Sequence, residues 1–265
     1  MKKHLISLLA FLMSCSWLQA FPPAPYYTIY GMVRDQVGQT PDVSGATLLL
    51  LRDGQEIGRT TIVVGLDLDQ NYELTIRIDQ NRTGTALYTD RAIASQGLYS
   101  LAVEMNGVLF YPIEVSGSLT AGKGGERVRL DLNLGADSDG DGLPDIWEQW
   151  QLYQAGYYPD GNGNWALHLI NKHGDLDHDG FTNWQEYVAG TFAGDATERF
   201  GLEIKEKSTT SVRFEFYSIT GKTYTIERSA DLKTWSPVAF AVGQATAQAA
   251  IFRADDVGIV SAFTS

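Results

Sequence analysis

Cysteine is almost absent from this sequence, which has a single one, Cys15, among 265 residues. That residue falls in an N-terminal segment typical of a secretory signal. Lys2-Lys3 precedes an apolar run from Leu5 to Met13, and residues 14–20 resemble a cleavage region. If residues 1–20 are the signal, cleavage after Ala20 leaves a mature protein without a thiol. Disulfides and cysteine metal sites are then excluded, so an exported chain must stabilise its small units in another way.

The same segment has a second interpretation, because Leu12-Met13-Ser14-Cys15 resembles a bacterial lipobox. Cleavage before Cys15 would give a lipid-anchored protein. Both interpretations predict an extracellular or cell-surface location. No other apolar run is long enough to span a bilayer, and the apolar part of the signal is itself too short, so we predict no transmembrane segment.

Basic residues are also scarce. The 20 Lys and Arg residues face 32 Asp and Glu residues, which gives a net charge of −12. An excess of negative charge argues against nucleic acid and anionic membrane surfaces as partners. It favours solubility and the binding of divalent cations.

Recognisable catalytic motifs are missing as well. His168 and His173 do not form the His-Glu-x-x-His arrangement of metalloproteases, and there is no nucleophile elbow and no phosphate loop. A pair of carboxylates such as Asp69, Glu73 or Asp79 could still meet in space as in a glycosidase. We therefore predict a non-catalytic structural or adhesion protein. Two alternatives stay open: a carbohydrate-binding module, and an accessory part of a polysaccharide hydrolase.

Two acidic segments share one spacing: Asp at positions 1, 3 and 5 of a twelve-residue loop, Gly at position 6 and Glu at position 12. Position 9 adds a side-chain oxygen and position 7 a backbone carbonyl. The predicted ligands are Asp137, Asp139, Asp141, Leu143, Asp145 and Glu148 in the first loop, and Asp175, Asp177, Asp179, Phe181, Asn183 and Glu186 in the second. Ca²⁺ is a hard cation that prefers several oxygen ligands, whereas zinc and copper prefer nitrogen and sulfur. We predict two structural calcium ions, bound with affinities of order 10⁻⁴ to 10⁻³ M.

Helical signals follow the acidic segments. Pro144 suits a helix start, and the segment from Asp145 to Ala155 reads as a helix that Gly156 ends. A capping box at residues 182–185 predicts a second helix that runs to Gly190. A third helix is expected from about Trp165 to His173.

The turn-rich connection between the two loops contains a weaker oxygen cluster, Asp160, Asn162 and Asn164. Such residues are more typical of a loop that hydrogen-bonds its own backbone than of a metal site. They are therefore not among the predicted ligands.

Strand patterns dominate both flanks. Tyr72 to Asp79 alternates apolar and polar residues, and Asp53-Gly54 and Asn106-Gly107 each separate two apolar runs, which is a strong hairpin signal. Residues 26–134 are expected to form an Ig-like or transthyretin-like β-sandwich. Residues 135–198 form the calcium-loop unit. Residues 199–265 form a mainly β module without a clear closing strand, which leaves that module incomplete in this interpretation.

Three stretches carry a resemblance to known proteins. The stretches from Gly142 to Glu148 and from Asn183 to Thr191 resemble calcium-loop segments of bacterial exported proteins, similar to thrombospondin type 3 repeats and to EF-hand or dockerin-like loops. The stretch from Gly221 to Trp235 resembles a β module often found after such loops. The resemblance implies calcium binding and is silent on activity. A polysaccharide or another surface protein stays open as a further partner. Pro144, at the position that pairs loops in an EF-hand, departs from that pattern. The terminal glutamates depart from many dockerin loops, which argues against cohesin binding.

Overall fold

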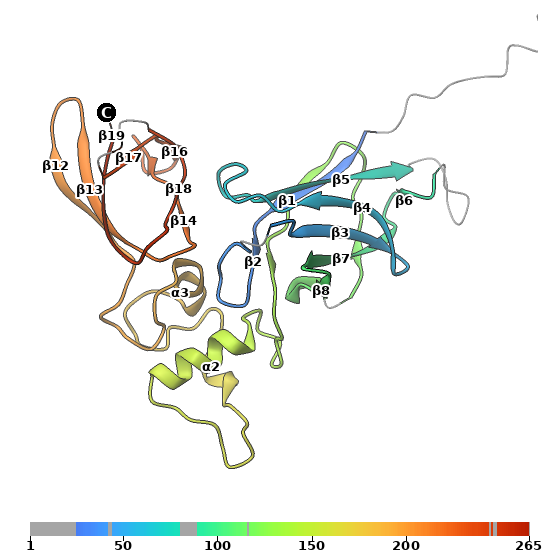
Figure 1. The fold of residues 1–265 in the computed structure, drawn as a ribbon, viewed down its shortest axis with the longest axis horizontal. Coiled ribbons are helices and arrows are strands. Elements are labelled where there is room, and N and C mark those ends of the chain that lie inside the picture. Colours follow the sequence, from blue (N-terminus) through green and yellow to red (C-terminus); the bar gives the residue numbers. More distant parts are fainter. Residues whose placement is uncertain are drawn as a thin grey trace, which may run out of the picture.

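The computed structural model describes residues 25–41, 44–79, 89–115, 117–243, 245 and 248–264. Within these ranges the chain is mainly β, with two α-helices (Figure 1). Buried apolar side chains gather in three larger clusters that follow one another along the chain. The expected signal segment and Cys15 lie outside the described residues. No helix in the described ranges is long and apolar enough to cross a membrane.

The first part of the chain forms two larger sheets and a short parallel pair. One sheet has the order β10-β1-β5-β6, the other has the order β4-β3-β7-β8 with β9 also on β7, and β2 pairs with β11. The bounds are β1 (Tyr27–Gly31), β2 (Val33–Arg34), β3 (Thr47–Arg52), β4 (Gln55–Thr61), β5 (Tyr72–Asp79), β6 (Ala92–Ala94), β7 (Leu98–Met105), β8 (Val108–Phe110), the 3₁₀ helix η1 (Ile113–Val115), β9 (Leu119–Thr120), β10 (Arg127–Arg129) and β11 (Leu132–Asn133). The two predicted hairpins are confirmed: Arg52 pairs with Gln55, and Met105 with Val108.

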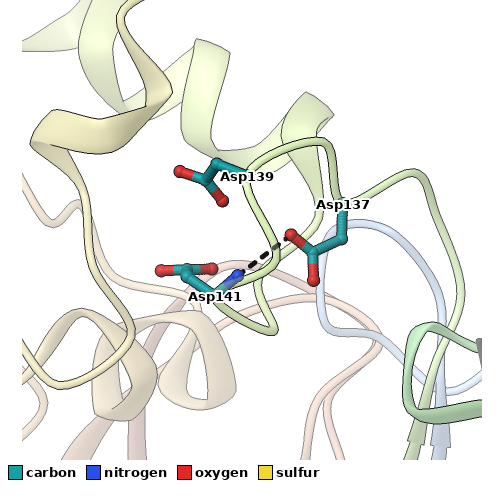
Figure 2. A group of neighbouring side chains, drawn as sticks. All are labelled: Asp137, Asp139 and Asp141. Carbon is teal, nitrogen blue, oxygen red and sulfur yellow. Dashed lines mark hydrogen bonds between the residues drawn. The ribbon is translucent and has the colours of Figure 1, made fainter.

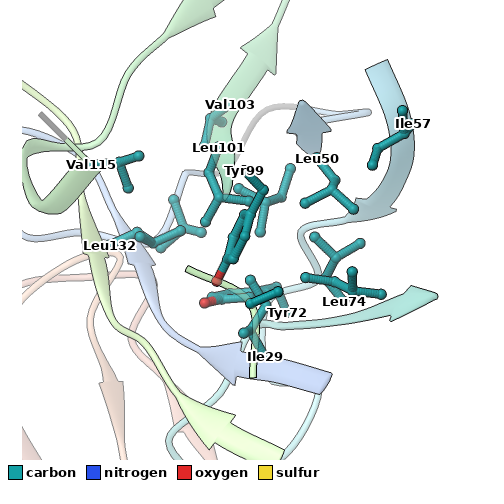
Figure 3. Close-up of a cluster of buried hydrophobic side chains, with 14 of the residues drawn as sticks. Ile29, Leu50, Ile57, Tyr72, Leu74, Tyr99, Leu101, Val103, Val115 and Leu132 are labelled. Carbon is teal, nitrogen blue, oxygen red and sulfur yellow. The ribbon is translucent and has the colours of Figure 1, made fainter. Parts of the chain in front are cut away.

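The two larger sheets share one hydrophobic core (Figure 3). Strand β5 buries every second residue, as its sequence alternation predicts. Its Leu74 packs in the same cluster as Ile29 of β1, Leu50 of β3 and Leu101 of β7. Each such side chain contributes about 1.5–3 kcal/mol when it leaves water, so this core holds the sheets together without a disulfide.

The middle part contains both α-helices, α2 (Asp145–Gln154) and α3 (Asn183–Ala189), and the 3₁₀ helix η2 (Leu167–Leu169). The predicted capping box is present: Gln185 N donates to Thr182 Oγ1 at 3.3 Å, and Thr182 N donates to Gln185 Oε1 at 2.8 Å. Gly190 ends α3 in a left-handed conformation with φ 88°. Both helix predictions that follow the acidic loops are thus confirmed.

The helix predicted from Trp165 to His173 is wrong, because only the single 3₁₀ turn η2 forms there. Ile170, which follows that turn, is extended. The Lys172 amide donates to the Asp141 carboxylate at 2.6 Å, and the His173 amide donates to Asn171 Oδ1 at 3.0 Å. Side chains therefore take the amide protons that a helix would have used.

The last part contains a sheet with the order β12-β13-β19-β17 and two short pairs, β14-β18 and β15-β16. The bounds are β12 (Leu202–Lys207), β13 (Val212–Ser218), β14 (Thr223–Tyr224), β15 (Glu227–Arg228), β16 (Ser236–Pro237), β17 (Ala241–Val242), β18 (Phe252–Arg253) and β19 (Gly258–Thr264). The expectation that no strand closes this part is wrong. β19 pairs with β13 over its whole length and lies between β13 and β17. The strand pattern in the sequence of β19 is weak, because Ala262 is its one buried residue and the apolar Ile259 is 74% exposed.

Candidate metal centres

Each acidic loop brings three carboxylates together. Asp137, Asp139 and Asp141 each offer an oxygen within 4.8 Å of the others, and Asp175, Asp177 and Asp179 do the same. Figure 2 shows the three side chains of the first group near one another on the loop that precedes α2. Three negative charges at this spacing repel one another, so the arrangement needs compensating donors or a cation.

The backbone supplies part of that compensation, in the same way in both loops. Asp137 accepts from Gly140 N at 2.8 Å and from Gly142 N at 3.0 Å. Asp175 accepts from His178 N at 2.8 Å and from Gly180 N at 3.0 Å. The glycines at position 6 have φ values of 92° and 99°, a conformation that lets the chain turn sharply.

Positions 5 and 9 repeat as well. Asp141 Oδ1 holds the Leu143 amide and Asp179 Oδ1 holds the Phe181 amide, both at 2.8 Å, which fixes the residues whose carbonyls are predicted ligands.

At position 9, Asp145 accepts from Ser138 N at 2.7 Å, and Asn183 accepts from Leu176 N at 3.1 Å. These two side chains each close a loop by binding its second residue.

The position-12 glutamates differ from all the others, because each is buried without a hydrogen-bond partner. Glu148 is 0% exposed and Glu186 is 1% exposed. Both carboxylate oxygens of each residue lack a hydrogen bond within the described residues. Burial and then the charges of Asp139 and Asp141 raise the pKa of Glu148 to about 9. Burial and then Asp177 and Asp179 raise the pKa of Glu186 to about 8.

An unpaired buried carboxylate is costly, and a second negative charge beside it adds to the cost. Here the charges of four aspartates act on Glu148 and those of three aspartates act on Glu186. A bound divalent cation offsets both terms, because it neutralises the charge and occupies the oxygens that no donor reaches. The donor set is oxygen only, which fits Ca²⁺ better than zinc or copper. The residues present therefore fit a calcium ion in each loop.

The sequence pattern missed one carboxylate whose charge acts on the second centre. Glu198 lies outside the twelve-residue loop, yet its charge contributes to the raised pKa of Glu186. Its Oε2 is buried without a partner, as are Asp177 Oδ2 and Asp179 Oδ2. In the first loop, by contrast, Asp141 Oδ2 holds the Lys172 amide. The second centre thus offers more free oxygens. No spacing rule links residue 198 to the loop, so only the fold reveals it.

Among the other candidate residues, Asp160 bonds within its own loop, and Glu73 and Asp79 lie apart. The carboxylate of Asp160 accepts hydrogen bonds from its own loop, from Asn162 N at 2.8 Å and from Asn164 N at 2.9 Å. Glu73 pairs with Arg127 at 3.1 Å. Glu73 and Asp79 lie six residues apart on β5, a span of roughly 20 Å at the usual strand rise.

No family model, curated protein or solved structure matches this chain.

Proposed function

We propose that this chain is a non-catalytic, calcium-stabilised exported protein. Two calcium ions stabilise the middle part, which lies between the two β parts along the chain. The observation that carries the proposal is the pair of glutamates, Glu148 and Glu186. Their four carboxylate oxygens are buried, lack hydrogen-bond donors and lie against aspartates. A protein without a cation would gain little from holding four such oxygens in this way.

The role that fits is structural. The middle part is short, and its hydrophobic cluster is small, with Leu143, Trp147, Leu152 and Tyr187 among its buried members. A small core seldom suffices alone, and metal binding to the folded state adds directly to the free energy of unfolding. Calcium, when bound, supplies positive charge and oxygen coordination; the loop residues orient the oxygens and keep the backbone turned.

The experiment is a calorimetric calcium titration of the chelator-treated protein, with magnesium titrated in parallel. The proposal expects two calcium ions per chain with dissociation constants of order 10⁻⁴ to 10⁻³ M and weaker magnesium binding. The matched variant is Glu148→Gln with Glu186→Gln, which keeps the shape of both side chains and removes both charges. Calcium uptake that this double variant leaves unchanged would contradict the proposal.

We further propose that the first β part is an Ig-like or transthyretin-like sandwich, that the last part is a module of the kind that follows such loops, and that the chain acts outside the cytoplasm. The shared core of the two larger sheets supports the first of these. The signal-like residues at 1–20 support the last. The mass of the mature protein tests the location: it separates cleavage after Ala20 from lipid attachment at Cys15.

A carbohydrate-binding role is the second candidate, because aromatic side chains stand exposed on and after α2. Trp150 and Tyr153 lie three residues apart on α2 and are 46% and 54% exposed, and Tyr157, which follows the end of the helix, is 45% exposed. Residues 145–171 contain no Lys or Arg, so a neutral glycan fits this face better than an anionic one. The test is binding to neutral polysaccharides by the wild type and by Trp150→Ala with Tyr153→Ala. Equal binding, or none, would remove this candidate.

A further inference from the structure

One buried lysine lies where all three parts of the chain meet. Lys222 is 6% exposed and lies in the last part of the chain, between β13 and β14. Its Nζ donates to the carbonyl of Gly38, in the first part, at 2.8 Å. It also donates to the carbonyl of Tyr187, on α3, at 2.8 Å. A single side chain thus binds the other two parts at once.

Among the residues that the structure describes, no carboxylate pairs with Lys222 directly, and its two hydrogen-bond acceptors are backbone carbonyls. Burial, with the charge of Arg34, lowers the pKa of Lys222 to about 7, while Asp35 acts in the opposite direction. A buried lysine without a carboxylate partner is costly. It persists here because both carbonyls satisfy it, so its contacts depend on the other two parts staying docked.

The backbone around Lys222 is packed too closely for side chains. A Cβ on Gly38 would lie 2.5 Å from the Tyr187 carbonyl oxygen and 2.8 Å from Lys222 Nζ. A Cβ on Gly190, which ends α3, would lie 2.9 Å from Lys222 Cε. Both glycines also have positive φ values. The junction therefore tolerates little displacement of any of its three parts.

Tyr187 connects this junction to the second metal centre. It follows Glu186 directly in α3, and its own side chain is 0% exposed. Its hydroxyl donates to the carbonyl of Asp35 at 2.8 Å. One residue therefore touches the first part through its side chain and the last part through its carbonyl. A change in the position of α3 moves both contacts.

We propose that the Tyr187–Lys222 contact links calcium binding in the second loop to the docking of all three parts of the chain. The inference rests on the proposed function, because it requires calcium at Glu186. Calcium that fixes Glu186 fixes the first turn of α3, which fixes the Tyr187 carbonyl and hydroxyl. Coupling between two equilibria is reciprocal. If bound calcium favours docking by a given factor, docking raises the calcium affinity by the same factor.

The test is hydrogen exchange of the full chain, with calcium and with chelator, in the wild type, in Lys222→Met and in the control Lys233→Met. Lys233 is exposed, and its amide donates to Asp231 within its own turn. In the wild type and the control, calcium should slow exchange by several-fold in both loops. It should also slow exchange at residues 35–39 and 219–222, which hold no predicted ligand. In Lys222→Met the loops should still be protected by calcium, and the effect at 35–39 and 219–222 should be lost.

Calcium affinity of the second loop gives the reciprocal measurement. Lys222→Met should weaken it, within the roughly 5- to 150-fold range of ordinary coupling, while Lys233→Met should not. If Lys222→Met does not fold, Gly38→Ala disturbs the same contact from the first part and should have the same effects. Protection at 35–39 and 219–222 that persists in these variants would overturn the linkage but leave calcium binding intact. Absence of calcium uptake by the wild type would instead overturn the proposed function together with the linkage.

Discussion

The Asp141 carboxylate accepts a hydrogen bond from the Lys172 amide at 2.6 Å, although the two residues lie 31 positions apart. This contact ties the first loop to the segment that leads into the second. The same segment also holds the start of α3, since Trp184 N donates to the Lys172 carbonyl at 3.1 Å and Asn183 Nδ2 donates to the Asn171 carbonyl at 2.7 Å. The two loops thus contact the same short backbone segment, residues 171–172. This shared contact takes the place of the loop pairing that Pro144 prevents in an EF-hand-like arrangement.

Because both loops contact this segment, Asp137→Ala should abolish calcium binding at the first loop and weaken it at the second. Loss of calcium at the first loop loosens Asp141 and with it the backbone on which α3 rests. We expect the second dissociation constant to rise by about fivefold or more, at the lower end of typical coupling between sites. A calcium titration followed by fluorescence of Trp184 measures it. Asp160→Ala is the control, and a second constant that stays within twofold of the wild type would exclude the coupling.

Glu198→Gln should lower the calcium affinity of the second loop directly. Its buried Oε2 lacks a partner and its charge acts on Glu186, so it adds negative charge to that centre. Residues that support ligands typically change metal affinity by about 10- to 100-fold, and we expect roughly tenfold here. The titration is done in a Glu148→Gln background, which silences the first loop. Exposed Glu227→Gln serves as the control, and the idea fails if both variants bind alike.

The connection around Asp160 should bind no ion, so calcium should saturate at two per chain. The oxygens of Asp160 already accept from Asn162 N, Asn164 N and Asn164 Nδ2. Asp160→Ala should leave the stoichiometry unchanged in a calorimetric titration. A third ion in the wild type that is missing in this variant would contradict the assignment.

In chelator, the two buried glutamates should make the protein less stable as the pH rises. Their pKa values in the folded protein, about 9 for Glu148 and about 8 for Glu186, lie above the ordinary value of 4.5. The folded state therefore keeps protons that the unfolded state loses. The resulting stability is present in full below about pH 4.5 and is lost as the pH climbs toward 8 to 9.

Urea unfolding at pH 5, 7 and 9 measures this effect against Glu148→Gln with Glu186→Gln, which cannot ionise at these positions. The free energy of unfolding of the wild type should fall relative to that of the double variant between pH 5 and pH 9. A constant difference would show that the glutamates are not buried as described. Added calcium should reverse the trend, because it binds the ionised form and releases protons.

Local patterns predicted the parts of the fold in which one short segment decides its own structure. The alternation from Tyr72 to Asp79, the Asn106-Gly107 turn and the capping box at Thr182 all depend on neighbours within a few residues. The spacing of the acidic residues likewise predicted which carboxylates gather in each loop. It also pointed to the glycines whose positive φ turns the chain.

The features that sequence patterns missed depend on residues far apart in the chain. Residues 165–173 do not form a helix because Asp141 takes the Lys172 amide. Strand β19 has weak alternation, and its place follows from pairing with β13 across about forty intervening residues. The charge of Glu198 acts on Glu186 from outside the loop, and no local pattern contains that relationship. The buried position of Lys222 depends on two other parts of the chain and has no local signal at all.

Thermal melting with calcium and with chelator tests the central claim most directly, on the wild type and on Glu148→Gln with Glu186→Gln. At 10 mM calcium and dissociation constants of 10⁻⁴ to 10⁻³ M, each ion should add about 1.4–2.7 kcal/mol to the free energy of unfolding. The melting temperature of the wild type should therefore rise by several degrees with calcium, and that of the double variant should not change. Identical wild-type melting temperatures in calcium and in chelator would contradict the account.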